Sequence, residues 1–105
     1  MTRDEIKALL VTADPNIRHY FSMSASEDYT YWEETRRLPF LADDNHVSNE
    51  AWRFYVHRFT RTESDSVAQT LFDTLDADPR TTVRWVTDFD KESGYIHHIF
   101  ECEGY

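Results

Sequence analysis

The chain has 105 residues, of which 40% are hydrophobic and 15% aromatic, and its formal net charge is −9 at pH 7. The length corresponds to one modest domain, the aromatic content excludes a disordered chain, and the acidic balance disfavours binding to nucleic-acid phosphates. Cys102 is the sole cysteine, so no internal disulfide can form and a reducing compartment is expected. No apolar run has the length of a signal core or a membrane span, which predicts an intracellular protein without a membrane partner.

The first predicted element is a helix over residues 2–12. Thr2 and Glu5 have the spacing of a capping box, and Pro15 follows the end of the helix. The apolar stripe of this helix consists of Ile6, Leu9 and Leu10. An apolar run over residues 17–23 comes next and is interpreted as a short strand or an irregular edge.

Four longer runs alternate in the manner of β-strands rich in aromatic and branched residues. They cover residues 29–36, 51–60, 81–89 and 95–103. Residues 38–48 read as a loop, and Gly94 supplies the conformational freedom that a hairpin turn between the last two strands needs. A second helix is predicted over residues 62–77, with Val67, Ala68, Leu71, Phe72 and Leu75 on its apolar face.

This order of elements predicts a single α+β domain over residues 1–105. We expect a twisted antiparallel sheet of about four strands, with two helices packed mainly on one face. The helix over residues 62–77 can cover about three strands. The helix over residues 2–12 is short and is expected to dock at an edge.

Aromatic residues occur on both faces of the predicted strands, which is the most informative feature of the sequence. In the strand over residues 51–60, Trp52, Phe54 and Val56 share one face, while Tyr55, His57 and Phe59 share the other. A solvated antiparallel strand should be polar on one side. Each aromatic ring buries roughly 150–250 Å², and a few rings would fill the roughly 800 Å² that a standard interface takes from each partner. We therefore expect self-association or docking, with a candidate interface made of Tyr29, Tyr31, Trp32, Phe40, Asp43, Asp44, His46, Trp52, Phe54, Phe59 and Tyr95.

The metal-ligand patterns in the sequence are weak. His97 and His98 are adjacent in a predicted strand and face opposite sides, and His19, His46 and His57 have no short pairing typical of zinc sites. The segment from Asp88 resembles the start of a calcium loop, but Gly94 is the seventh residue instead of the sixth, and Ile99 stands where a glutamate should close the loop. The segment over residues 43–46 is denser in ligands, and a contact loop is favoured there over a weak cation site. We predict neither a metal nor a cofactor.

Catalytic patterns are equally weak. Glu33 and Glu34 alternate across a strand and so do not form a facing pair of carboxylates. His98 and Cys102 share a face but lie about 13 Å apart along the strand, too far for activation of the thiol. The sequence has no glycine-rich phosphate loop, serine elbow or dinucleotide fingerprint. We therefore do not expect an enzyme. Loss of a measured activity on Asp44→Ala would instead support an enzyme that uses the loop over residues 43–46.

In pattern and order, the whole chain resembles the small tail-completion proteins of long-tailed phages and prophages, also called tail terminators or head-tail joining proteins. The segments that carry the resemblance are residues 2–10, 29–33, 42–45, 52–60 with the closing pair Phe59-Thr60, and 86–101. Two departures exist. Glu27-Asp28 precede Tyr29 where the family commonly has a proline, and Leu38-Pro39-Phe40 reshapes the next segment.

The resemblance implies a structural protein that terminates the tail tube and forms the head-tail joining interface. Such proteins assemble in rings, often hexameric, so the implied partners are further copies of the chain, the tail tube protein and the head-closure or connector protein. The implied location is the host cytoplasm during assembly and then the head-tail junction of the virion. No specific nucleic-acid binding and no catalytic residue are expected.

A small acidic binding protein that mimics DNA and inhibits a nucleic-acid enzyme is the main competing interpretation. Such a protein needs acidic groups at phosphate-like spacing on one face. Here the acidic residues are spread through predicted helices, loops and turns, which makes the tail-completion interpretation the stronger of the two.

Overall fold

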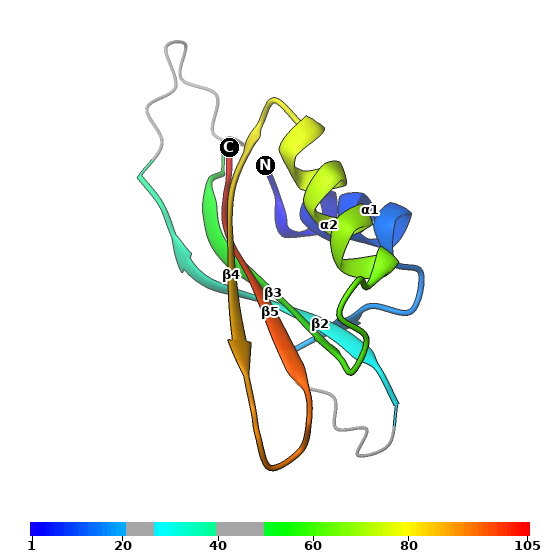
Figure 1. Cartoon of the computed structure of the whole chain (residues 1–105). Helices are drawn as coiled ribbons and strands as arrows, with labels where there is room; N and C mark the ends of the chain where they lie inside the picture. The colour runs from blue at the N-terminus through cyan, green and yellow to red at the C-terminus, as the bar shows by residue number, and fades with distance from the viewer. Residues whose placement is uncertain (21–26, 40–49) are drawn as a thin grey trace, which may run out of the picture.

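Two helices lie side by side on one side of a twisted sheet (Figure 1). The computed structural model describes residues 1–20, 27–39 and 50–105. The elements in chain order are α1 (Arg3–Ala13), β1 (Arg18–His19), β2 (Tyr29–Arg37), β3 (Trp52–Thr60), α2 (Ser66–Ala77), β4 (Thr81–Phe89) and β5 (Ile96–Gly104). The predicted α+β class is therefore confirmed. Within the described ranges, neither helix has the length and apolar character required to cross a membrane.

The sheet has five strands in the order β1-β2-β3-β5-β4. The four long strands pair antiparallel, as predicted. β1 adds a short parallel pairing that makes the sheet mixed, with Arg18 opposite Tyr31 and His19 opposite Trp32. Side-chain contacts with β2 also hold this segment: the His19 ring stacks 4.0 Å from that of Trp32, and its Nε2 lies 2.6 Å from Oε2 of Glu34.

At the start of each helix, the side chain of the capping residue accepts a hydrogen bond from a backbone N–H that has no partner within the helix. In α1 the Glu5 N–H donates to Thr2 Oγ1 at 3.1 Å and the Thr2 N–H donates to Glu5 Oε1 at 3.0 Å, which confirms the capping box. In α2 the Ala68 N–H donates to Oδ2 of Asp65 at 2.9 Å. Because Asp65 is the cap, α2 starts at Ser66, and residues 62–65 form the connector from β3 instead of its first turn.

The core fills the space between the helices and one face of the sheet. Its fully buried apolar side chains include Ile6 and Leu10 of α1, Leu71 and Leu75 of α2, and Trp32, Phe54, Val56 and Phe100 of the sheet. α1 lies against α2 and contributes to this central cluster. The first helix is therefore part of the core, because its apolar stripe is buried beside that of α2.

Candidate functional site

The face of the sheet opposite the helices carries a continuous set of aromatic and apolar side chains. We call it the open face, because no described helix lies over it (Figure 1). The register aligns its residues in cross-strand rows. The two rows nearest the β4–β5 turn are Tyr29, Phe59, His97 and Asp88, followed by Tyr31, His57, Ile99 and Val86. The alternation predicted for the strand over residues 51–60 is confirmed, since Phe54 and Val56 face the helices and Tyr55, His57 and Phe59 do not.

The rings of the open face stack on one another across strands. The centroids of Tyr29 and Phe59 are 4.7 Å apart, those of Phe59 and His97 are 4.1 Å apart, and those of Tyr31 and His57 are 4.5 Å apart. The planes in these pairs are within 18° of parallel. Each ring covers part of its neighbour, so the rings are half-buried. The result is a broad, flat surface of stacked rings over which no described helix lies.

A chain of hydrogen bonds joins β2, β3 and β5 on this face. Oε1 of Glu33 lies 3.3 Å from Nε2 of His57, and Nδ1 of His57 lies 2.8 Å from Nε2 of His97. A carboxylate only accepts, so the His57 Nε2–H donates to it, and the neutral His57 ring then accepts at Nδ1 from the His97 Nε2–H. Burial lowers the pKa of His57, and burial together with the neighbouring His57 lowers the pKa of His97 to about 4. Both imidazoles are therefore neutral at pH 7.

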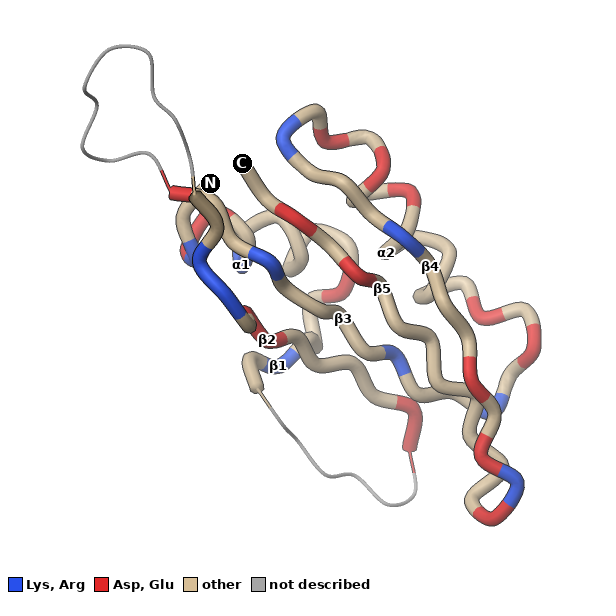
Figure 2. The backbone as a smooth tube through the Cα atoms, turned by 90° about the vertical axis from the view of Figure 1, so that its left-hand side faces the viewer, with Lys and Arg blue, Asp and Glu red and all other residues tan. Residues whose placement is uncertain are grey.

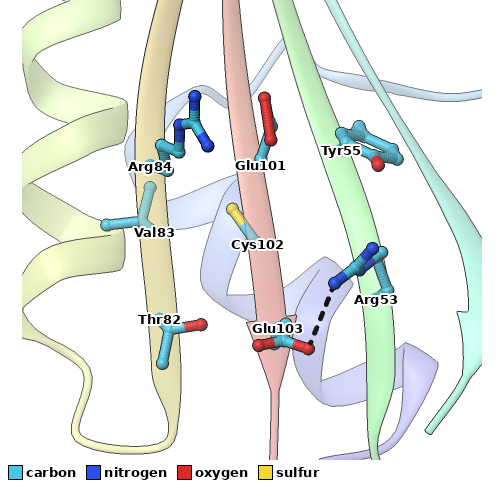
Figure 3. A pocket seen from close by; sticks show the side chains of 8 residues that line it. All are labelled: Arg53, Tyr55, Thr82, Val83, Arg84, Glu101, Cys102 and Glu103. Atoms are coloured by element: carbon cyan, nitrogen blue, oxygen red, sulfur yellow. Dashed lines mark ion pairs between the residues drawn. The ribbon is translucent and has the colours of Figure 1, made fainter.

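The other end of the open face is charged. A shallow pocket of about 270 Å³ lies there, and Figure 3 shows the side chains from β3, β4 and β5 that line it. The residues of the open face in this lining are Arg53, Tyr55, Thr82, Arg84, Glu101 and Glu103. Arg53 and Glu103 form an ion pair with a distance of 3.6 Å between Nη2 and Oε2. Arg84 is directly opposite Glu101 in the register, so the signs of charge alternate from strand to strand.

On the helix side of the sheet, the polar groups serve the packing. Arg58 is 8% exposed and donates to both carboxylate oxygens of Asp65 at 2.9 and 3.2 Å, and to Thr30 Oγ1 at 3.3 Å. Burial opposes ionisation of Asp65, but the bonds from Arg58 and the Ala68 N–H outweigh it and lower the pKa of this carboxyl. These bonds attach the start of α2 to the middle of the sheet.

His98 is also buried on the helix side. Its Nδ1 accepts from the Trp85 indole N–H at 3.0 Å, which places the proton of the neutral ring on Nε2. This Nε2 has no hydrogen-bond partner among the described residues, and burial lowers the pKa of the ring. Cys102 is 2% exposed, and burial strongly raises the pKa of its thiol. A buried thiol of this kind stays protonated and is a poor nucleophile.

The structure separates the predicted interface residues into three groups. Tyr29, Tyr31 and Phe59 lie on the open face, whereas Tyr95 is only 8% exposed and packs edge-on against Tyr29 and Phe59 beside them. The prediction was wrong for Trp32 and Phe54, which are 1% and 0% exposed in the core, and Trp52 also faces the helix side, below the guanidinium of Arg3. The remaining predicted residues lie outside the described ranges and are Phe40, Asp43, Asp44 and His46.

Sequence reasoning missed the bond between His57 and His97. The two residues are 40 positions apart, and only the pairing of β3 with β5 brings them together. The sequence did contain a local signal, because strand alternation places both histidines on the face opposite Phe54 and Phe100. The separation of His97 from His98, and of Glu33 from Glu34, follows the predicted alternation.

Over residues 1–20, 27–39 and 50–105, no three histidine, cysteine or acidic side chains gather closely enough to hold a metal ion. In the same ranges, no hydrogen bond joins a serine or cysteine to a histidine. What the open face offers is stacking area, two neutral imidazoles and a charged end. Comparison with known protein-family models and with curated proteins finds no match.

Proposed function

We propose that the chain is a structural subunit of a phage or prophage tail, which terminates the tail tube and joins it to the head by assembling in a ring. The observation that carries this proposal is the open face, a wide surface of stacked rings on the side of the sheet that the helices leave uncovered. A neighbouring subunit or a tail component would bury that surface. Interfaces between proteins are enriched in such aromatic side chains.

The charge of the chain is consistent with this role. A net charge of −9 discourages DNA from adhering to a channel through which it must pass. The order of helix, strands, helix and hairpin also agrees with the resemblance to tail-completion proteins.

The alternative role as a DNA mimic receives less support from the open face. A mimic presents acidic groups at phosphate-like spacing. At the charged end of this face, arginines of β3 and β4 lie opposite glutamates of β5 instead.

The proposal is tested by measuring the mass of the full chain in solution, alone and with polymerised tail tube. The wild-type chain is expected to form rings or to bind the tube. Phe59→Asp should prevent assembly, because it places a charge in the centre of the stacked rings. Val11→Asp is the matched control, since Val11 is an exposed apolar residue on α1, away from the open face. A wild-type chain that stays monomeric and never binds the tube would refute the proposal.

A variant that loses its fold would also fail to assemble, so thermal unfolding is recorded for each protein. Tyr31→Asp provides a second substitution on the open face. Assembly is expected to fail for both open-face variants while their unfolding remains cooperative.

A further inference from the structure

The open face has an acidic, aromatic pocket at the end near the β4–β5 turn. Its volume is about 390 Å³, and it is lined by Tyr29, Phe59, Asp88, Asp90, Ser93, Tyr95 and His97. Three rings and a neutral imidazole form the walls, and two carboxylates stand at the rim, where both aspartates are exposed. We call it the acid-aromatic pocket.

The chemistry of this pocket suits a guanidinium group. Among the described residues, no basic group lies within ion-pair distance of Asp88 or Asp90. The hydrogen bond from Ser93 Oγ lowers the pKa of Asp90, which keeps it ionised. The neutral His97 adds no repulsion to an incoming cation. The ring of Tyr95 already accepts one guanidinium, because the Arg61 Cζ lies 3.9 Å from its centroid.

At the opposite end of the same face lies an arginine that forms no ion pair with the described residues. Arg36 is exposed and directly opposite Arg53 in the register of β2 and β3. Like charges directly opposite in a sheet destabilise it. Arg53 is neutralised by Glu103 at 3.6 Å, whereas no described carboxylate lies within ion-pair distance of Arg36. Figure 2 looks onto the open face, with basic positions of β2 and β3 at one end and, at the other, acidic positions that flank a basic one around the β4–β5 turn.

We propose that Arg36 of one copy inserts its guanidinium into the acid-aromatic pocket of a neighbouring copy. This inference rests on the self-assembly stated under the proposed function and specifies how neighbouring copies meet. Tyr29 and Arg36 are seven residues apart on β2, which corresponds to about 23 Å along the strand. The donor and the acceptor lie at different ends of one face, so a two-fold contact would form both pairs at once and stop at a dimer. The ring of the proposed function needs the head-to-tail arrangement, in which each copy donates to one neighbour and accepts from another. Contacts of this kind generate a closed ring when the rotation between copies closes.

The register also provides a matched control. A bulge between Glu34 and Arg36 shifts the pairing, so that Arg36 is opposite Arg53 on the open face and Arg37 is opposite Trp52 on the helix side. Arg36→Glu and Arg37→Glu therefore make the same change of charge on neighbouring exposed residues. Only the first changes the open face.

The experiment measures the dissociation constant for self-association of the full chain by sedimentation, at low and high salt. Arg36→Glu and Asp88→Arg are each expected to weaken association by about tenfold or more, and Arg37→Glu by less than about threefold. The double variant R36E/D88R restores an attraction with the signs exchanged, so it should associate at least about threefold more tightly than either single variant, although Asp90 and the lost guanidinium stacking keep it weaker than the wild type. Added salt should weaken the wild-type contact, as it does other exposed charge pairs.

Two further variants guard against loss of structure. Asp90→Asn removes a charge but keeps an oxygen that accepts from the Glu92 N–H, while its amide N–H can donate to Ser93 Oγ, and it should weaken association in the same direction as Asp88→Arg. Cooperative thermal unfolding of each variant shows that it is folded. Arg36→Lys should retain only part of the wild-type affinity, because the ammonium group of lysine is not planar and does not stack on aromatic rings as a guanidinium does.

The outcomes separate this inference from the function on which it rests. Rings that form equally well with Arg36→Glu, or a double variant that fails to recover, overturn the inference and leave the proposed function standing. A wild-type chain that neither self-associates nor binds tail tube overturns both. If tube binding requires Asp88 but is insensitive to Arg36→Glu, the pocket takes a basic group of the tube protein, and the contact between copies is refuted.

Discussion

Lowering the pH from 7.5 to 5 is expected to destabilise the folded chain by about 2 kcal/mol, mainly through His97. The ordinary pKa of a histidine is 6.5, and burial between Phe59 and His57 lowers the pKa of His97 to about 4. A group whose pKa is lowered by folding contributes stability that is fully present above pH 6.5 and is lost as the pH falls toward 4. At pH 5 the unfolded histidine is protonated and the folded one is neutral. A pH of 5 lies about one and a half units below the pKa of the unfolded histidine. Each unit corresponds to about 1.36 kcal/mol of lost stability, which gives the value of about 2 kcal/mol.

Other groups around His97 act on the same equilibrium. Asp88 on β4 attracts the charged ring and so limits the shift, whereas His57 on β3 and His98 repel it. His57 also has a lowered pKa and is hydrogen-bonded to His97, so the two rings titrate as a pair. The loss of stability in acid is therefore a property of the pair, with His97 as the larger contributor.

The assay is urea unfolding followed by tryptophan fluorescence at pH 7.5 and pH 5, at a concentration at which the chain is monomeric. His97→Phe keeps a ring against Phe59 but cannot bind a proton, so its loss of stability between the two pH values should be smaller than that of the wild type by about 2 kcal/mol. Val11→Ala is the control, because Val11 is an exposed residue of α1 away from both histidines, and its pH dependence should match the wild type. Equal losses for the wild type and His97→Phe would refute the reasoning.

Three further outcomes are expected of the folded chain. Arg58→Met should lower the free energy of unfolding by about 3 kcal/mol, measured in urea, because it leaves Asp65 and Thr30 without their buried partner; a loss below about 1 kcal/mol would contradict this. Thr2→Ala removes one half of the capping box of α1 and should lower the free energy of unfolding in urea by about 1 kcal/mol. An unchanged urea midpoint would contradict the role of the cap. The Cys102 thiol should react with a thiol reagent only at the rate at which the chain opens, so a rapid reaction under native conditions would show that this strand end is open.

Much of the local structure was predictable because its causes are local. The capping box of Thr2 and Glu5 involves residues three apart, and it defines the start of α1 in the structure as in the sequence. The alternation of Phe54 with Tyr55 follows from strand geometry alone, so the two-sided character of β3 was evident without knowledge of its partners. The turn that needs Gly94 is equally local, and this residue has a φ of +75°.

The start of α2 and the role of α1 could not be predicted in the same way. Several residues between 62 and 66 are suitable caps by type, and the ion pair of Arg58 with Asp65 selects one of them. A stripe of apolar residues shows that α1 must be buried, but it does not show against what. The contact with α2 decides that α1 belongs to the central core.

The sequence by itself determined which side chains share a strand face, and hence that both faces of the sheet are aromatic. Only the tertiary structure decided which face the helices cover, that Trp32 and Phe54 are core residues, and that His57 meets His97. The physical reason is that the direction of a side chain follows from the backbone of its own strand. Burial and cross-strand contact depend instead on pairings between residues far apart in the chain, which no local pattern specifies.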